Sequence, residues 1–240
     1  MFDRRKYKNF AKQQLKGRWG PVVLMTLIIS MILSLFQIPD LIKLFNSTEF
    51  WNLIYGTSTD FLTSYTIATN ESTSLISSLL QTIADAIFTV AALNLYLKMS
   101  RSPEKVTLKT FIEGLNDWLR AALAGLWQLL WVFLWSLLFI IPGIVKAYAY
   151  SQIYYLVVEY KNLSVTKAMR ISMIITKGHK WDLFVTQMSF LGWAILCCFT
   201  AGIGLLWLEP YMNMTLTNAY HAMLKEALES GKIKPEDLTE

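Results

Sequence analysis

Cysteine and histidine are scarce in this chain of 240 residues, which has two of each. The cysteines, Cys197 and Cys198, are neighbours inside an apolar run, so they provide neither a disulfide framework nor metal-ligand spacing. No Asp or Glu stands at ligand spacing with His179 or His221, and no nucleophile has a base beside it. We therefore expect no metal, no cofactor and no enzyme activity.

Charge is also scarce, since charged residues make up 16% of the chain and apolar residues 54%. A soluble domain of this length needs more charge for its surface. The apolar residues occur in long blocks, as in proteins whose solvent is hydrocarbon. There is no Gly-rich phosphate loop and no soluble basic domain, so a dinucleotide fold and nucleic-acid binding are excluded. The composition predicts an all-α, polytopic membrane protein.

The apolar blocks predict about six transmembrane helices within a single membrane domain that covers residues 1–240. These spans are residues 21–38, 75–97, 121–141, 143–158, 183–207 and 211–228. Three amphipathic segments, residues 2–19, 104–118 and 164–177, are predicted to lie along the membrane interface. The aromatic connection of residues 41–74 is predicted to lie on the membrane surface.

Local residue types predict how these segments begin, turn and pack. Ser102 and Ser164 are expected to be the N-caps of the second and third amphipathic helices. Tight turns are expected at 142–143 and 209–210, where a proline interrupts the apolar pattern. Three glycines of the fifth span are expected to let a neighbouring helix approach closely: Gly192, Gly202 and Gly204. The charged tail after residue 229 is expected to fray.

Lysine and arginine are concentrated in alternate connections. Seven lie in residues 1–20, five in 98–120 and five in 159–182, against one in 39–74. The positive-inside rule therefore places both termini in the cytoplasm. Each basic segment ends in a glycine followed by a tryptophan: Gly17 and Trp19, Gly114 and Trp118, Gly178 and Trp181. This pattern indicates either three repeats of interfacial helix, outgoing span and returning span, or convergence on common membrane-protein features.

The C-terminal half also resembles a known family. IPGIVKAYAYSQIYYLVVE, LSVTKAMRISMIITKGHKWDLF and the Gly-rich FLGWAIL and TAGIGLLWLEPY resemble the bacterial integral membrane family catalogued as domain of unknown function 975. More distantly, the proline turn, the long helix, the helix SVTKAMRIS and the following G-x-x-W resemble the membrane domains of some glycerophosphodiester phosphodiesterases. The resemblance implies a multi-pass protein of the bacterial inner membrane and implies no established activity. The acidic ligands and paired histidines of the phosphodiesterase domain have no counterpart here.

One candidate site is a basic patch that would contact anionic lipid headgroups. A cationic amphipathic helix that ends in tryptophan attracts such headgroups by about 1 kcal/mol per basic residue near the surface. The same residues equally serve topology and anchoring, and His179 would add sensitivity to pH. The patch consists of Lys167, Arg170, Lys177, His179, Lys180 and Trp181.

A second candidate is a polar site inside the membrane, formed by Asp85, Lys146, Tyr148, Ser151 and Tyr155. Ionisable groups within spans often mark ion or substrate pathways, and one face of the tyrosine-rich fourth span would line a cavity for amphipathic molecules. Alternatively, Asp85 is protonated, Lys146 extends its ammonium group outward and the tyrosines pack between helices.

Two functions follow from these sites. The first is a non-enzymatic scaffold or accessory protein that associates with membrane lipids, with another membrane protein or with further copies of itself. The second is a small transporter or a protein that handles lipids or other amphiphiles through the interior around Asp85 and the fourth span.

Overall fold

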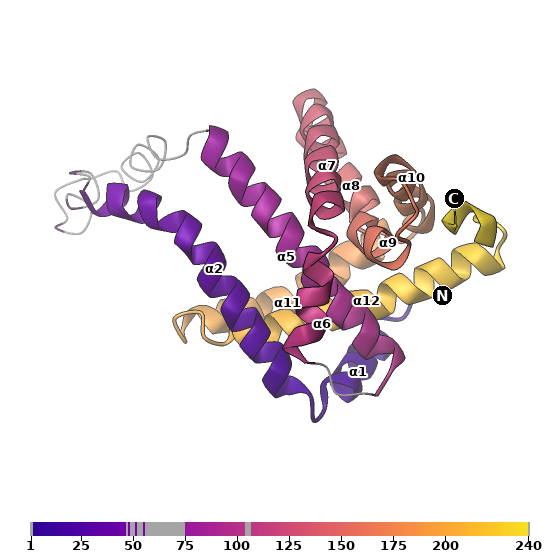
Figure 1. The fold of residues 1–240 in the computed structure, drawn as a ribbon, viewed down its shortest axis with the longest axis horizontal. Helices are drawn as coiled ribbons and strands as arrows, with labels where there is room; N and C mark the ends of the chain where they lie inside the picture. Colours follow the sequence, from indigo (N-terminus) through magenta and orange to yellow (C-terminus); the bar gives the residue numbers. More distant parts are fainter. Residues whose placement is uncertain are drawn as a thin grey trace.

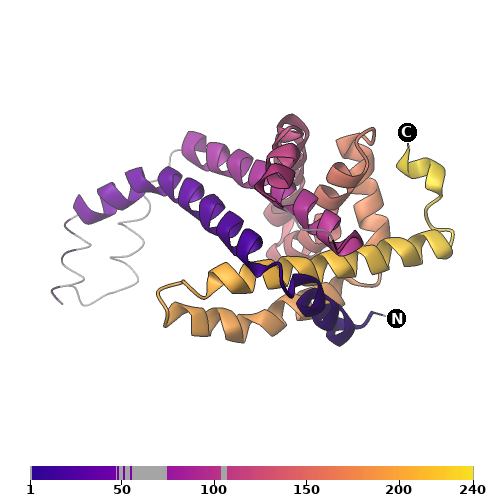
Figure 2. The same ribbon diagram turned by 60° about the horizontal axis from the view of Figure 1, so that its bottom comes forward.

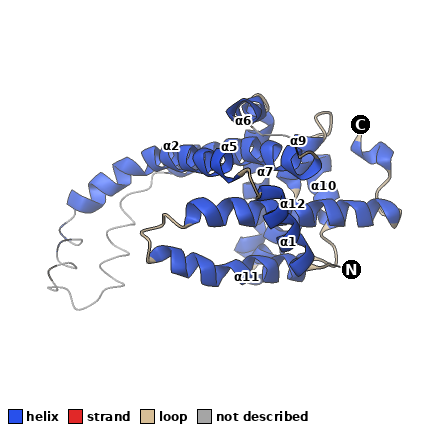
Figure 3. Ribbon diagram, turned by 90° about the horizontal axis from the view of Figure 1, so that it is seen from below, coloured by secondary structure: helices blue, strands red, loops and turns tan. Residues whose placement is uncertain are grey.

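Helices form the regular structure in the part of the chain that the computed structural model describes, namely residues 2–46, 48, 51, 55, 75–103 and 107–239 (Figures 1 and 3). No strand occurs in those residues, so the predicted all-α class is confirmed for them. In chain order the elements are α1 (Arg4–Leu15), α2 (Trp19–Asn46), α5 (Leu75–Arg101), α6 (Leu108–Leu115), α7 (Trp118–Leu138), α8 (Ile140–Tyr150), α9 (Ile153–Glu159), α10 (Val165–Ile175), α11 (Lys180–Cys198), α12 (Leu205–Glu229) and the 3₁₀ helix η1 (Pro235–Leu238).

These helices form three units of the same kind. Each unit has a short amphipathic helix, an outgoing helix and a returning helix: α1, α2 and α5; then α6, α7 and α8 with α9; then α10, α11 and α12. A tryptophan stands at the first or second position of every outgoing helix: Trp19, Trp118 and Trp181. The helix order therefore matches the predicted succession of a short amphipathic segment and two apolar segments.

The three units pack around one another in a ring. Each short helix packs on the returning helix of the preceding unit: α6 on α5, α10 on α9, and α1 on α12. Each outgoing helix lies against the returning helices of its own and the preceding unit: α7 against α8 and α5, α11 against α12 and α8, and α2 against α5 and α12. Because α1 packs on α12, the first unit follows the third in space and the ring closes; Figure 2 shows α1 beside the α11–α12 hairpin.

The core of this ring repeats from unit to unit. The returning helices contact one another through α5 with α9 and α5 with α12, and Tyr155 of α9 stacks on Tyr220 of α12 with ring centroids 4.7 Å apart. Each outgoing helix buries its fourth and seventh residues: Val22 and Met25, Ala121 and Ala124, Leu183 and Thr186. This spacing of three is one face of a helix, so a single buried stripe joins each outgoing helix to the ring.

Glycine allows two of the helix contacts to be very close. A Cβ atom on Gly114 of α6 would lie 2.7 Å from the Cα atom of Ala91 in α5. A Cβ atom on Gly125 of α7 would lie 2.7 Å from the Cβ atom of Ala86, also in α5. The predicted close approach at Gly192 is wrong, because a Cβ atom there has no neighbour within 4 Å.

The two short reversals lie at other residues than predicted. Phe139, with extended backbone, separates α7 from α8, and the predicted turn residues Pro142 and Gly143 lie in the first turn of α8, where proline loses no helical hydrogen bond. The second reversal lies between Cys198 and Leu205, with Ala201 and Gly202 in the left-handed region at φ 50° and 82°. The turn predicted at 209–210 is wrong, since both residues lie within α12.

The helix ends confirm one predicted cap and correct another. The Ser164 hydroxyl accepts a hydrogen bond of 3.3 Å from the Lys167 amide at the start of α10, as predicted. Ser102 is not a cap, because Thr107 precedes α6, and residues 104–106 of the predicted helix lie outside the described residues. The tail after α12 is not frayed, since Ile233 and Leu238 are buried. Residues 41–46 of the connection 41–74 belong to α2. Residues 48, 51 and 55 are also described, and the prediction for the rest of the connection lies outside the described residues.

The predicted fourth span is two helices, because the chain breaks at Ser151 and Gln152 between α8 and α9. The break is stabilised by α10. The hydroxyl of Ser172 donates to the carbonyl oxygen of Ala149 at 2.8 Å and accepts from the amide of Gln152 at 3.2 Å. The Thr176 hydroxyl donates to the same carbonyl at 3.3 Å. Side chains of α10 thus replace helical hydrogen bonds lost at the break.

Replacing Ser172 with Ala is expected to lower the free energy of unfolding by about 1 to 2 kcal/mol, because it leaves the buried Gln152 amide without its hydrogen-bond acceptor. Unfolding of the detergent-solubilised protein by sodium dodecyl sulfate, followed by circular dichroism, measures the change. Ser30→Ala is the matched control, because exposed Ser30 donates to the Leu27 carbonyl within its own helix, α2. Equal stability of the two variants would contradict this role of Ser172.

Three described helical stretches are long and apolar enough to cross a membrane: Leu79–Arg101, Trp118–Leu138 and Lys180–Cys198. A fourth is added if α1 and Trp19–Leu35, which are bent by 99°, are counted as one broken span. These stretches support a membrane protein. The count of six spans and the cytoplasmic position of both termini stay predictions.

Candidate functional site

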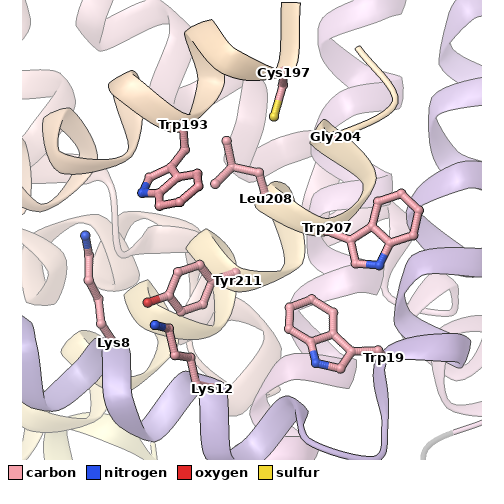
Figure 4. Close-up of a pocket in the computed structure, with 9 residues that line it drawn as sticks. All are labelled: Lys8, Lys12, Trp19, Trp193, Cys197, Gly204, Trp207, Leu208 and Tyr211. Atoms are coloured by element: carbon pink, nitrogen blue, oxygen red, sulfur yellow. The ribbon is translucent and has the colours of Figure 1, made fainter. Parts of the chain in front are cut away.

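A groove lined by tryptophan and lysine side chains lies where the first and third units meet (Figure 4). Its volume is about 590 Å³, within the range of small-molecule sites, about 300 to 1,000 Å³. We call it the aromatic groove. It is lined by Lys8, Lys12, Trp19, Trp193, Cys197, Gly204, Trp207, Leu208 and Tyr211.

The two lysines of the aromatic groove come from α1. Lys8 and Lys12 are one helical turn apart and therefore lie on the same face, beside the buried residues Tyr7, Ala11 and Leu15 that pack α1 on the core. The ammonium nitrogen of Lys8 lies 4.0 Å from the ring centroid of Phe190, and that of Lys12 lies 5.6 Å from that of Tyr211. Both ammonium groups therefore face the α11–α12 hairpin, as Figure 4 shows.

Hydrogen bonds hold α1 in this position. The Asn218 amide of α12 donates to the Gln14 side chain at 2.8 Å and to the Tyr7 carbonyl at 3.5 Å. Just after α1, the Arg18 guanidinium donates to the carbonyl oxygens of Met99, at 3.4 Å, and Ser102, at 2.9 Å. The lysine-bearing helix is thus fixed at its middle and at its end, so the lysines have a defined place relative to the groove.

The electrostatic surroundings of the lysines are positive. Burial lowers the pKa of the Lys8 ammonium group below its ordinary value, and the charges of Arg4 and Lys12 lower it further. Among the described residues, no ion pair joins Lys8 or Lys12 to a carboxylate. Their close contacts are the aromatic faces of Phe190 and Tyr211. An anion at this end of the groove would relieve the repulsion between the ammonium groups.

The walls of the aromatic groove are apolar and partly open. Trp193 of α11 is 62% exposed and Trp207 of α12 is 48% exposed. The α11–α12 reversal ends the groove, where Gly204 lies against the side chain of Cys197. The groove therefore has a cationic end at α1 and an indole-lined apolar stretch along the hairpin, a combination that suits an amphiphile.

The predicted headgroup patch is divided by the fold. Arg170, Lys177 and Trp181 are exposed, as is Lys167, and Lys180 is half-buried. His179 instead points inward, with Nε2 3.2 Å from a Glu226 carboxylate oxygen and Nδ1 3.7 Å from one of Asp182. Its ring also stacks on Phe2 at 5.7 Å. His179 therefore joins α11 to α12 and to the segment before α1.

The predicted intramembrane residues do not form one site. Lys146 lies with its ammonium nitrogen 4.3 Å from the ring centroid of Trp135, and the Tyr148 hydroxyl donates to the Gln187 side chain at 2.6 Å. Ser151 bonds the Tyr148 carbonyl within its own helix turn, and Tyr155 is buried against Tyr220. These contacts favour the prediction that the tyrosines pack between helices.

Asp85 lies apart from the other four residues, in a cavity of about 260 Å³ between α2, α5 and α12. Glu209 and Asn213 of α12 line the same cavity, together with apolar residues that include Ile29 and Phe88. In the part of the chain that the structure describes, no three His, Cys, Asp or Glu residues come close enough to hold a metal ion.

The groove could not be predicted from the sequence. Lys8, Lys12 and Trp19 lie in residues 2–19, which are predicted only as an amphipathic interfacial segment. Trp193, Trp207 and Tyr211 stand about 180 residues or more further along the chain. They reach α1 only because the third unit packs on the first, and no local pattern predicts that contact.

The comparison with family models matches residues 128–227 to the family described as "Protein of unknown function (DUF975)". The matched region extends from the middle of α7 into the last turns of α12, so it includes the hairpin wall of the aromatic groove. No curated protein and no solved structure matches the chain. The more distant likeness to glycerophosphodiester phosphodiesterase membrane domains is not supported by these comparisons. The predicted resemblance is confirmed over residues 128–227, which match the model of DUF975, a family of proteins of unknown function.

Proposed function

We propose that this protein is a non-enzymatic membrane protein that binds an amphiphilic molecule in the aromatic groove. The observation that carries this proposal is the groove itself, in which the ammonium groups of Lys8 and Lys12 stand at one end of a space walled by Trp193 and Trp207. A charged end joined to an apolar stretch matches the two parts of an amphiphile. The site differs from the predicted one around Asp85 and the fourth span.

We propose a topology of six crossings with both termini in the cytoplasm of a bacterial cell. The support is the position of the basic residues at the starts of the outgoing helices. Arg18 and Arg120 bind carbonyl oxygens at the C-terminal ends of α5 and α9, and His179 pairs with Glu226 near the end of α12. All three units thus have a basic group at the end where returning helices finish, as expected of a cytoplasmic face.

The tryptophan walls provide the test of amphiphile binding. Replacing Trp193 and Trp207 together with Ala is expected to reduce the retained amphiphile about tenfold, a loss of about 1.4 kcal/mol. Native mass spectrometry of protein extracted with its surrounding lipid measures the retained mass. The matched control is Trp118→Ala with Trp181→Ala, because both of these residues are exposed indoles outside the groove.

Equal retention by both double variants would contradict the proposal. A different result is that the unaltered protein retains a second polypeptide in fixed proportion and no amphiphile. That result would replace amphiphile binding with the scaffold function expected from the sequence. The scaffold function is therefore an outcome of the same measurement.

A further inference from the structure

The cationic end of the aromatic groove defines the kind of headgroup that would fit there. Lys8 and Lys12 lie one turn apart on a helix that also carries Arg4, and their positive charges repel one another. The described residues supply no carboxylate partner to either lysine. A zwitterionic headgroup would bring a further ammonium group into this positive region, whereas an anionic headgroup would bring only the missing negative charge.

The apolar stretch of the groove identifies the rest of the ligand. Trp193, Trp207 and Leu208 line it without an acidic or basic group among them. Both indoles are partly exposed on a hairpin whose outgoing helix, α11, is apolar enough to cross a membrane. A hydrocarbon chain buried there gains about 0.8 kcal/mol per methylene group removed from water, whereas a free phosphate ion would gain nothing from these walls.

We infer that the ligand is an anionic phospholipid, with its phosphate between Lys8 and Lys12 and one acyl chain along Trp193 and Trp207. This inference rests on the proposed function and adds the chemical class of the ligand. Lysine ammonium groups bind phosphate as point charges, and two of them on one helix face suit a phosphodiester whose remaining headgroup is uncharged. The proposed lipid site thus lies on α1 and the α11–α12 hairpin. The patch predicted from the sequence lies elsewhere, at Lys167, Arg170, Lys177, His179, Lys180 and Trp181.

A competition between two lipids tests the inference. Delipidated protein in a neutral detergent receives equal amounts of phosphatidylglycerol and phosphatidylcholine with the same acyl chains, and native mass spectrometry counts each bound lipid. The unaltered protein is expected to prefer phosphatidylglycerol about tenfold. Replacing Lys8 and Lys12 together with Gln is expected to reduce the preference to about equal binding while lipid is still retained, because the apolar walls are unchanged.

Two control variants separate the site from net charge and from misfolding. Arg170→Gln with Lys177→Gln removes the same charge from exposed positions outside the groove and is expected to keep the preference. Lys8→Arg with Lys12→Arg retains both charges and is expected to keep it as well. Loss of preference in the Arg170 and Lys177 variant would place the selectivity in the exposed basic face and overturn the inference.

The outcomes for the unaltered protein distinguish the two levels of the proposal. Binding of both lipids equally would overturn the anionic class but leave the amphiphile-binding function intact. Binding of neither lipid would overturn both. Displacement of phosphatidylglycerol by soluble glycerol phosphate would show a free phosphate site and overturn the assignment to a lipid.

Discussion

Replacing Arg120 with Ala is expected to lower the free energy of unfolding by about 3 kcal/mol or more, because one guanidinium group satisfies three carbonyl oxygens. It donates to Val157 at 3.2 Å, to Tyr160 at 3.1 Å and to Leu163 at 2.6 Å. These carbonyls lie in the last turn of α9 and in the connection to α10, and that of Tyr160 also accepts from the Leu163 amide at 3.1 Å. The substitution therefore releases α7 from the start of the third unit.

The geometry of Arg120 also predicts that lysine will not replace it. A guanidinium presents several donors in a fixed plane, whereas an ammonium is a single point charge. Arg120→Lys is thus expected to recover less than half of the loss. Sodium dodecyl sulfate unfolding of the solubilised protein, followed by circular dichroism, measures both variants.

Arg170→Ala is the control for Arg120, because Arg170 is exposed on α10. Its replacement is expected to change the stability by no more than about 0.5 kcal/mol. If Arg120→Ala were as mild as Arg170→Ala, the three carbonyls would be satisfied in some other way and the joint between the units would not depend on this residue.

Arg18 has the same place in the first unit as Arg120 has in the second. Both lie near the start of an outgoing helix and donate to carbonyl oxygens at the end of a returning helix of the same unit. The carbonyl end of a helix carries partial negative charge, which a cation stabilises. Basic residues that the sequence presents as topology signals therefore also hold the first and second units closed.

Sequence periodicity predicted those parts of the fold that depend on neighbours in the chain. The cationic and apolar faces of α1 and the Ser164 cap of α10 follow from residues within one or two turns. The recurring glycine and tryptophan predicted the order of the helices but left open whether the three units are repeats.

Contacts between units account for what periodicity missed. The break between α8 and α9 depends on Ser172, which lies 23 residues after Ala149 in the chain. A continuous apolar run contains no sign of it, because the lost helical hydrogen bonds are replaced from another helix. The second reversal was missed for a local reason, because it depends on the left-handed residues Ala201 and Gly202 and not on Pro210.

The aromatic groove shows the same limit at the level of function. Its lysines belong to the first unit and its tryptophans Trp193 and Trp207 to the third. The ring closes because α1 packs on α12, so the first short helix has the place that α6 and α10 have in the other units. Because α1 packs on the third unit, the groove forms between residues near the two ends of the chain.

Replacing Gly114 with Ala is expected to destabilise the protein by about 3 kcal/mol, because the added methyl group meets backbone rather than a movable side chain. Its Cβ atom would lie 2.7 Å from the Cα atom of Ala91 and 3.2 Å from the Cβ atom of Asn94. Moving α6 away would also strain the 3.1 Å hydrogen bond from the Asn94 amide to the Thr110 carbonyl and the 2.8 Å ion pair of Lys98 with Glu113.

The same substitution at Gly192 is expected to have the opposite sign. Gly192 lies inside α11 with open space around it, so alanine there gains helix propensity, about 0.5 to 1 kcal/mol. Detergent unfolding of the two variants beside the unaltered protein measures both changes. A general effect of alanine would change the stability of both variants in the same direction. Destabilisation by Gly114→Ala with stabilisation by Gly192→Ala is therefore specific to the contact between α6 and α5. Stabilisation by Gly114→Ala would mean that α6 does not lie against Ala91, and the ring of three units would lose one of its joints.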